Sequence, residues 1–338
     1  MISRIAEKTI RTLLRGFPIV TITGPRQSGK TTLARAVFKN KPYASLEEPD
    51  LRQAAQDDPR SFLARYPKGA VLDEVQRCPA ILSYLQTMVD TEGRMGLYIL
   101  TGSQQFGFMS GITQSLAGRT AFVELLPFAT PELTTASKLP ANIDDMLLTG
   151  CYPPIYDRKL EPSSWYSAYV TAYVERDVRQ MLKIQELETF QRFVRLCAGR
   201  TGQLLNLSSL ATECGITHNT AKAWISVLDA SYLVFLLHPH SVNFSKRLVK
   251  MPKLYFYDTG LAAWLLGIRT TEQMVTHPLR GSIFETFIIS ELIKSKFNKG
   301  DKPSFFFWRD SNGNEIDLIV ERGTKLQPIE IKSGRTLT

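Results

Sequence analysis

A glycine-rich segment between a β-branched run and a helical stretch constrains the fold of this chain more than any other feature. The run IVTIT at residues 19–23 is followed by GPRQSGKTT. Glycines in this spacing let the backbone wrap a triphosphate with its N–H groups pointing inward, and the helix that follows adds its positive N-terminal end. The pattern predicts an ATP site formed by Gly24, Pro25, Arg26, Gln27, Ser28, Gly29, Lys30, Thr31 and Thr32. Lys30 would neutralise the β and γ phosphates, and the Thr31 hydroxyl would ligand Mg²⁺.

Three further strand-like runs define the class of the amino-terminal fold. They lie at residues 69–76, 96–104 and 121–128 and are separated by helical stretches. Strands that alternate with helices predict an α/β fold, a parallel sheet covered by helices.

Two acids end the run AVLDEVQ. Asp73 is predicted to hold Mg²⁺ through water, and Glu74 to polarise the attacking water. Adjacent acids after a strand are common, so this interpretation depends on the glycine-rich segment upstream. The next strand ends in ILTGSQQ, where Ser103 or Gln104 would sense the γ-phosphate or would simply face solvent. Arg119, in SLAGRT, is predicted either to reach a neighbouring subunit's nucleotide or to be an ordinary surface arginine.

Composition limits the number of globular cores, the cellular location and the kind of partner. The chain has 338 residues, 43% of them hydrophobic, which is enough for two or three globular cores. No apolar run has membrane-spanning length, and the first 16 residues resemble an amphipathic helix rather than a signal peptide, so a cytoplasmic location is expected. The scattered Cys78, Cys151, Cys197 and Cys214 are predicted to be reduced thiols. The net charge of +9 favours a polyanionic partner.

Several motifs in a specific order resemble those of one group of proteins. They are TGPRQSGKTTL, VLDEVQ, LTGSQQF, LAGRT, PKLYFYDTGL, FWRDSNGNEIDLIVE and IEIKSG. Together they resemble the bacterial and archaeal AAA-type ATPases that carry a C-terminal domain of unknown function. The resemblance implies a P-loop ATPase domain, a winged-helix segment and a small α+β part similar to restriction endonucleases. We place these parts at residues 1–132, 202–274 and 275–338, with a helical lid or linker at 133–201.

Residues 207–237 predict a helix, a turn at Gly215, a longer helix and a strand. In the second helix Ala221, Trp224, Ile225 and Leu228 would share one buried face. Its other side offers a polar set that could enter a DNA major groove, or contact a protein instead: His218, Asn219, Thr220, Lys222 and Ser226. Phosphate contacts would come from Lys246, Arg247, Lys250 and Lys253. A long helical stretch at 163–200 precedes this region, ending at Gly199, and its Arg176, Asp177 and Arg179 form either an inter-domain network or a solvated face.

The stretch EIDLIVERGTKLQPIEIKSG at 315–334 predicts a hairpin that turns on Gly323-Thr324. That register places Asp317 opposite Glu330, and like charges there call for a cation. Together with Glu285 and Lys332 these carboxylates match a nuclease-like Mg²⁺ site. The alternative is a Glu315–Lys332 salt bridge. Because few residues follow Lys332, we expect this domain to be truncated or reduced.

These patterns predict a Mg²⁺-dependent, homo-oligomeric ATPase of the AAA type that couples its nucleotide state to nucleic-acid binding, most simply DNA. Two alternatives stay open. One is a slow nucleotide-dependent assembly switch that acts on protein partners, and the other is an ATP-regulated, metal-dependent nuclease.

Overall fold

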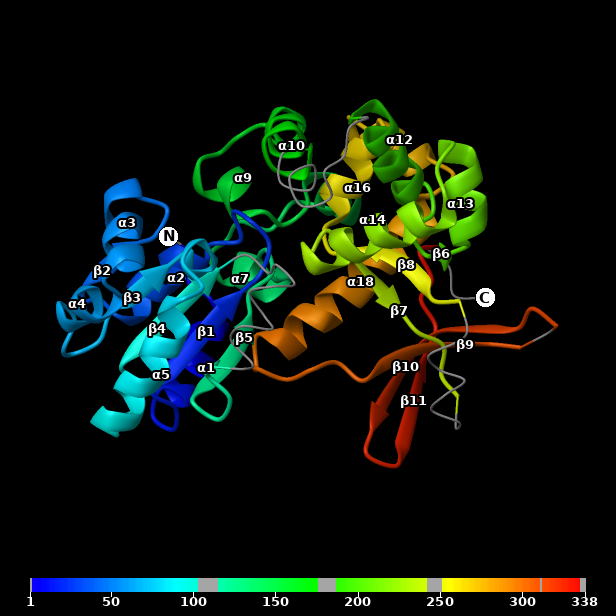
Figure 1. Ribbon diagram of the computed structural model, residues 1–338. Coiled ribbons are helices and arrows are strands. Elements are labelled where there is room, and N and C mark those ends of the chain that lie inside the picture. The colour runs from blue at the N-terminus through cyan, green and yellow to red at the C-terminus, as the bar shows by residue number, and fades with distance from the viewer. Residues whose placement is uncertain (1, 103–114, 176–186, 242–250, 311, 335–338) are drawn as a thin grey trace. The chain divides into compact units, whose positions relative to one another are not determined.

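The computed structural model describes the chain except residues 1, 103–114, 176–186, 242–250, 311 and 335–338 (Figure 1). The described chain divides into two compact units. Unit 1 comprises residues 1–128 and 294–301, and unit 2 comprises residues 129–293 and 302–338. Among the described residues, no helix is both long enough and apolar enough to cross a membrane.

Unit 1 is built on a parallel sheet, as the alternating strand and helix patterns predicted. Within the described residues the sheet has five strands in the order β2-β3-β4-β1-β5, and every neighbouring pair is parallel. The strands are β1 (Ile19–Thr23), β2 (Tyr43–Ser45), β3 (Val71–Asp73), β4 (Tyr98–Gly102) and β5 (Thr120–Glu124). Strand β4 lies between β1, which precedes the glycine-rich loop, and β3, which ends at Asp73.

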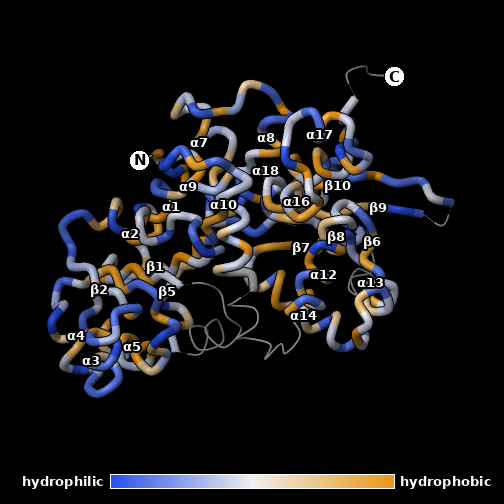
Figure 2. The backbone as a smooth tube through the Cα atoms, turned by 90° about the horizontal axis from the view of Figure 1, so that it is seen from above, coloured by the Kyte–Doolittle hydropathy of each residue, from blue (hydrophilic) through white to orange (hydrophobic). Residues whose placement is uncertain are grey.

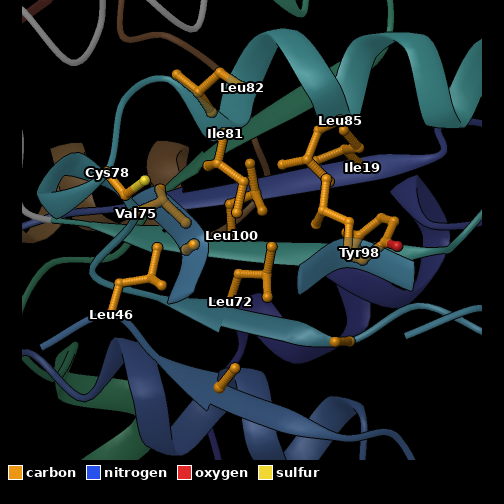
Figure 3. Packing of buried hydrophobic residues seen from close by; sticks show 14 of the residues in the cluster. Ile19, Leu46, Leu72, Val75, Cys78, Ile81, Leu82, Leu85, Tyr98 and Leu100 are labelled. Carbon is orange, nitrogen blue, oxygen red and sulfur yellow. The ribbon is translucent and has the colours of Figure 1, made fainter. Parts of the chain in front are cut away.

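Both faces of this sheet are covered by helices, which explains why its strands are continuous apolar runs. The covering segments are α1 (Ala6–Leu13), α2 (Lys30–Val37), α3 (Pro49–Asp57), α4 (Pro59–Ala64), η1 (Val75–Arg77) and α5 (Ile81–Glu92). Ile19 packs into one core cluster while its neighbour Val20 packs into the other, as successive strand residues must. Figure 3 shows the first cluster, in which Ile81 and Leu85 of α5 project toward strand residues of the sheet.

Unit 2 is mostly helical, and its described residues include two small antiparallel sheets. Its helical segments are α7 (Thr130–Thr135), α8 (Ile143–Thr149), α9 (Pro153–Asp157), α10 (Pro162–Tyr169), η2 (Val170–Glu175), α12 (Leu187–Ala198), α13 (Leu207–Cys214), α14 (His218–Ala230), α16 (Thr259–Leu265), α17 (Thr271–Thr276) and α18 (Arg280–Phe297), whose last residues belong to unit 1. One sheet has the order β6-β8-β7, with β6 (Gln203–Leu204), β7 (Val234–Leu237) and β8 (Lys253–Phe256). The other has the order β11-β10-β9, with β9 (Phe305–Arg309), β10 (Glu315–Arg322) and β11 (Lys325–Ile329).

The helix, turn, helix and strand predicted after residue 202 are confirmed. Helix α13 ends at Gly215, which adopts φ +72°, and α14 and β7 follow. The predicted buried face of α14 is also confirmed, since Ala221, Trp224, Ile225 and Leu228 are all buried.

The predicted long helical stretch at 163–200 is confirmed where it is described. It comprises α10, the π-helical η2 and α12, and α12 ends at Ala198 just before the predicted stop at Gly199. Arg176, Asp177 and Arg179 lie outside the described residues. All four cysteines are free and buried, as expected for reduced thiols.

The closing hairpin has the predicted register. Arg322 pairs with Lys325 and Leu318 with Ile329, so the turn falls on Gly323 and Thr324. Gly323 has φ +60°, a value that glycine adopts without strain. Strand β10 also pairs with β9, and the end of β9 and the beginning of β10, which face each other there, are hydrophilic (Figure 2).

Candidate functional site: a phosphate-binding loop and its neighbouring strand ends

The loop after β1 adopts a conformation that requires glycine at its first position. Gly24 has φ +146°, and a β-carbon there would lie 2.2 Å from the carbonyl oxygen of Leu125. Gly29, at φ +93°, is the N-cap of α2. Gln27 is also left-handed, with φ +60°. The backbone therefore turns tightly before α2 and brings the loop N–H groups toward the helix N-terminus, the geometry that favours an anion.

Lys30 is buried within this loop. Its side chain is 6% exposed, and Nζ donates hydrogen bonds to the carbonyl oxygens of Gly24 at 3.0 Å and Pro25 at 2.7 Å. Burial lowers the pKa of Lys30 from 10.5 to about 8, although Glu74 and Asp73 act in the opposite direction. The ammonium is thus desolvated, and within the described part of the chain its hydrogen bonds go to neutral carbonyls, so phosphate oxygens would be better partners for it.

Asp73, at the end of β3, gathers three hydroxyl groups. The Thr31 hydroxyl donates to its carboxylate at 2.9 and 3.0 Å, and the Tyr43 hydroxyl donates at 2.8 Å. The Thr101 hydroxyl also donates to it. Burial, followed by the bond to Asp73, raises the pKa of Tyr43 to about 12, so Tyr43 remains a donor. Thr31 and Asp73 together present hydroxyl and carboxylate oxygens, the donor set that suits Mg²⁺.

Glu74 follows in a strained backbone conformation. It has φ 57° and ψ 42°, a left-handed geometry that is uncommon for a non-glycine residue. Its backbone N–H donates to the Thr101 hydroxyl at 3.4 Å, and its carboxylate accepts from Gln76. Strain of this kind costs about 1–3 kcal/mol and is concentrated at functional sites. Glu74 is therefore held beside Asp73 by neighbours on β4 and η1.

Three residues at this site were not identified from the sequence. Tyr43 and Thr101 reach Asp73 from the two strands on either side of β3. Arg4 is 8% exposed and donates from Nη1 to the Ser28 carbonyl and from Nη2 to the Leu126 carbonyl, each at 2.7 Å. The guanidinium also lies 5.0 Å from the Phe128 ring centroid. Arg4 therefore ties the loop to the segment that follows β5.

The buried Ser28 hydroxyl has no hydrogen-bond partner among the described residues. A buried hydroxyl without a partner is unfavourable, and a bound phosphate oxygen would remove that penalty. Ser103 and Gln104, predicted to sense the γ-phosphate, lie outside the described residues.

Arg119 lies far from this chain's own phosphate loop. It directly precedes β5, which runs parallel to β1, whereas the loop follows the end of β1, so Arg119 lies at the opposite end of the strands, about 15 Å along them. Its guanidinium contacts Asp90 through Nε at 2.6 Å and Nη2 at 2.7 Å. To act on a neighbouring subunit's nucleotide, as predicted, Arg119 would have to leave this ion pair.

The carboxylates predicted to hold a second metal ion have other partners. Asp317 accepts the backbone N–H of Ile331 at 2.8 Å, and Glu330 accepts from Lys332 at 2.6 Å. Glu285, on α18, lies 3.2 Å from Nζ of Lys253. The described part of the chain contains no group of three or more His, Cys, Asp or Glu residues that could hold a metal ion. Glu285, Asp317 and Glu330 therefore do not form the ligand group that the hairpin register suggested.

Lys253 was predicted to contact DNA, and that prediction is wrong. Its side chain is 2% exposed and contacts Glu285 and Glu315 inside unit 2. The alternative Glu315–Lys332 pair is not formed, because Lys253 and Arg309 are the partners of Glu315. Lys246, Arg247 and Lys250 lie outside the described residues.

Sequence comparisons divide the chain into three matched regions. An AAA domain profile matches residues 16–134, the region of the parallel sheet and the phosphate loop. Two profiles described as domains of unknown function, DUF8612 and DUF4143, match residues 140–272 and 280–338.

Two mycobacterial proteins are related to this chain in sequence, and one solved ATPase structure is similar to it in fold. Uncharacterized protein Rv2008c of Mycobacterium tuberculosis and uncharacterized protein Mb2031c of Mycobacterium bovis are each 30% identical over 336 residues. These matches cover 98% of this chain and 74% of each relative. The Walker-type ATPase PABY2304 of Pyrococcus abyssi has a similar fold, with a TM-score of 0.51 and 13% identity over 78% of this chain and 96% of that one.

Proposed function

The chain belongs to the family of the mycobacterial protein Rv2008c, with an AAA-type P-loop domain at residues 16–134, and we propose that it binds and hydrolyses ATP at the loop after β1. The observation that carries the proposal is the contact between Thr31 and Asp73. It brings the two halves of a nucleotide site, separated by more than forty residues of sequence, within hydrogen-bond distance.

Each residue of the site has a separate task in this proposal. The loop N–H groups and Lys30 bind the phosphates, and Lys30 exchanges its two backbone carbonyl partners for phosphate oxygens. Glu74 orients and polarises the attacking water, and Thr101 positions Glu74 through its backbone N–H. Tyr43 and Thr101 fix the Asp73 carboxylate. Thr31 and Asp73 would hold Mg²⁺, which supplies electrostatic stabilisation to the phosphates when bound.

The test is ATP binding and hydrolysis by wild type, Lys30→Ala and Thr31→Ala. We expect Lys30→Ala to lose both activities, because it removes the only side-chain charge of the loop that is buried among the predicted phosphate ligands. Thr31→Ala should retain weak binding that no longer responds to Mg²⁺. The matched control is Lys325→Ala, which removes an exposed lysine on β11. ATP hydrolysis that persists in Lys30→Ala would refute the site.

We also propose that unit 2 binds nucleic acid through α14. His218, Asn219, Lys222 and Ser226 are exposed on the side of this helix opposite its buried face. Thr217 caps the helix by accepting the Thr220 N–H at 3.1 Å, which leaves the first turn well ordered for contacts. A short helix, a glycine turn and an exposed polar second helix are the arrangement that helix-turn-helix proteins insert into the major groove.

Fluorescence anisotropy with labelled double-stranded DNA tests this second proposal. Lys222→Ala should weaken binding and reduce the slope of log affinity against log salt by about one. Lys325→Ala is again the matched control. Binding to protein partners alone, with no DNA affinity in wild type, would contradict the proposal and favour the assembly-switch alternative.

A further inference from the structure

A buried lysine lies among the carboxylates of unit 2. Lys253 comes from the middle strand of the β6-β8-β7 sheet and is 2% exposed. Its Nζ is 3.2 Å from Glu285 Oε1 and contacts Glu315 Oε1 more closely. The Phe307 ring, itself buried, lies 5.6 Å from the ammonium. Lysine is rarely buried unless it is paired, so this position depends on the two carboxylates.

Glu285 and Glu315 each have a second polar partner besides Lys253. Tyr255, two residues along β8 and so on the same strand face as Lys253, donates to Glu285 Oε1 at 2.5 Å. Arg309 Nη1 lies 3.5 Å from Glu315 Oε2. Asp317, on β10, accepts the Ile331 N–H at 2.8 Å. The cluster thus joins three elements that are distant in sequence: β8, α18 and β10.

The electrostatics indicate that Lys253 is charged. Burial lowers its pKa, but Glu285 and Glu315 outweigh that effect and the net pKa is raised. Burial raises the pKa of Glu285, and Lys253 partly offsets the rise. Burial likewise raises the pKa of Asp317, with Glu330 and Glu315 adding to it. Acids in this setting need a nearby cation to remain ionised, and the buried Lys253 contacts two of them, Glu285 and Glu315.

We propose that Lys253 is the resident cation of the cluster formed by Glu285, Glu315 and Asp317, in the place that a divalent metal ion would occupy in a nuclease-like site. The carboxylates are therefore already compensated, and the C-terminal part of unit 2 does not need a metal ion to fold. With Lys253 in that place, the cluster has no position for the ion that would supply hydrolytic chemistry. This inference does not depend on ATP hydrolysis, because it concerns unit 2 alone.

Mn²⁺ binding by the nucleotide-free, full-length protein tests the inference, measured by electron paramagnetic resonance. Lys253→Met keeps the length of the side chain and removes its charge. We expect this variant to bind one more equivalent of Mn²⁺ than wild type, and Lys253→Met/Glu285→Gln to lose that extra equivalent. Lys325→Met, at an exposed position, should bind the same amount as wild type. Any ion at Thr31 and Asp73 is common to all four proteins and cancels in the comparison.

Thermal unfolding gives an independent result. Removing one partner of a buried ion pair is strongly destabilising, so Lys253→Met should lower Tm by about 10 °C. The double variant should recover part of that loss, and Mn²⁺ should raise the Tm of Lys253→Met more than that of wild type.

The Mn²⁺ measurements can contradict the proposal whether or not Lys253→Met folds. A folded Lys253→Met with no additional Mn²⁺ would overturn the proposal. If Lys253→Met does not fold, the comparison of wild type with Glu285→Gln takes its place. Mn²⁺ bound by wild type and lost in Glu285→Gln would then overturn the proposal, whereas equal binding by the two proteins would support it.

Discussion

The buried ammonium of Lys30 makes nucleotide affinity depend on pH in a defined direction. Burial lowers the pKa of Lys30 to about 8 in the nucleotide-free loop. A triphosphate would raise it well above that value, because opposite charge favours the protonated form. Below pH 8 the lysine is already charged and binding needs no proton. Above pH 8 the free loop is mostly neutral, so each binding event must take up a proton and affinity falls.

The size of the effect follows from the same pKa. Between pH 7 and pH 9 the protonated fraction of the free protein falls about tenfold, so the Kd for ATP should rise about tenfold. Proton uptake should be about 0.5 per ATP at pH 8 and about 0.9 at pH 9. The same shift has a consequence for folding. Because the folded pKa lies below the ordinary value of 10.5, the charged lysine destabilises the empty protein by about 3 kcal/mol at neutral pH, and stability rises between pH 8 and 10.5.

Isothermal titration calorimetry with a non-hydrolysable ATP analogue measures both quantities. Titrations in two buffers of different ionisation enthalpy give the number of protons taken up, and titrations from pH 7 to pH 9.5 give the Kd profile. Lys30→Arg is the control, because arginine stays charged throughout this range and should remove the dependence. A Kd that does not change between pH 7 and pH 9 in wild type would show that the lysine is not desolvated as described.

Three further substitutions test the roles of Glu74, Gly24 and Arg4. Glu74→Gln should retain nucleotide binding and lose about 10²-fold or more in kcat, as expected when a group that polarises water is neutralised; an unchanged kcat would exclude that role. Gly24→Ala should destabilise the protein by about 3 kcal/mol or more in denaturant unfolding, since its β-carbon would meet the Leu125 carbonyl at 2.2 Å. Gly93→Ala, also left-handed but with no atom within 4 Å, should lose only about 1 kcal/mol, and equal losses would refute the steric argument. Arg4→Met should raise the Kd for ATP about tenfold because the Ser28 carbonyl loses a charged donor, whereas the exposed Arg15→Met should not.

Local patterns predicted the loop and the elements around it. The glycine spacing, the strand before Gly24 and the helix from Lys30 are all set within a dozen residues. The register of the closing hairpin followed from Gly323, since a two-residue turn fixes every later pair. The buried face of α14 followed from helical periodicity.

Contacts between distant residues could not be predicted in the same way. Tyr43 and Thr101 reach Asp73 only because β2 and β4 flank β3, an order that no local pattern specifies. Lys253 was expected to contact DNA phosphates, but the carboxylates that bury it lie 32 and 62 residues further along the chain, where no local pattern indicates them. The position of Arg119 could have been predicted. It precedes a strand parallel to β1, so strand direction alone places it at the end of the strands opposite the loop.

Steady-state ATP hydrolysis with and without double-stranded DNA, using Lys30→Ala as the blank, tests the central claim most directly. We expect that wild type hydrolyses ATP, that DNA increases the rate several-fold, and that Lys30→Ala shows neither effect. A rate that DNA does not change would contradict the predicted coupling of nucleotide state to nucleic-acid binding, and a rate retained by Lys30→Ala would contradict the site itself.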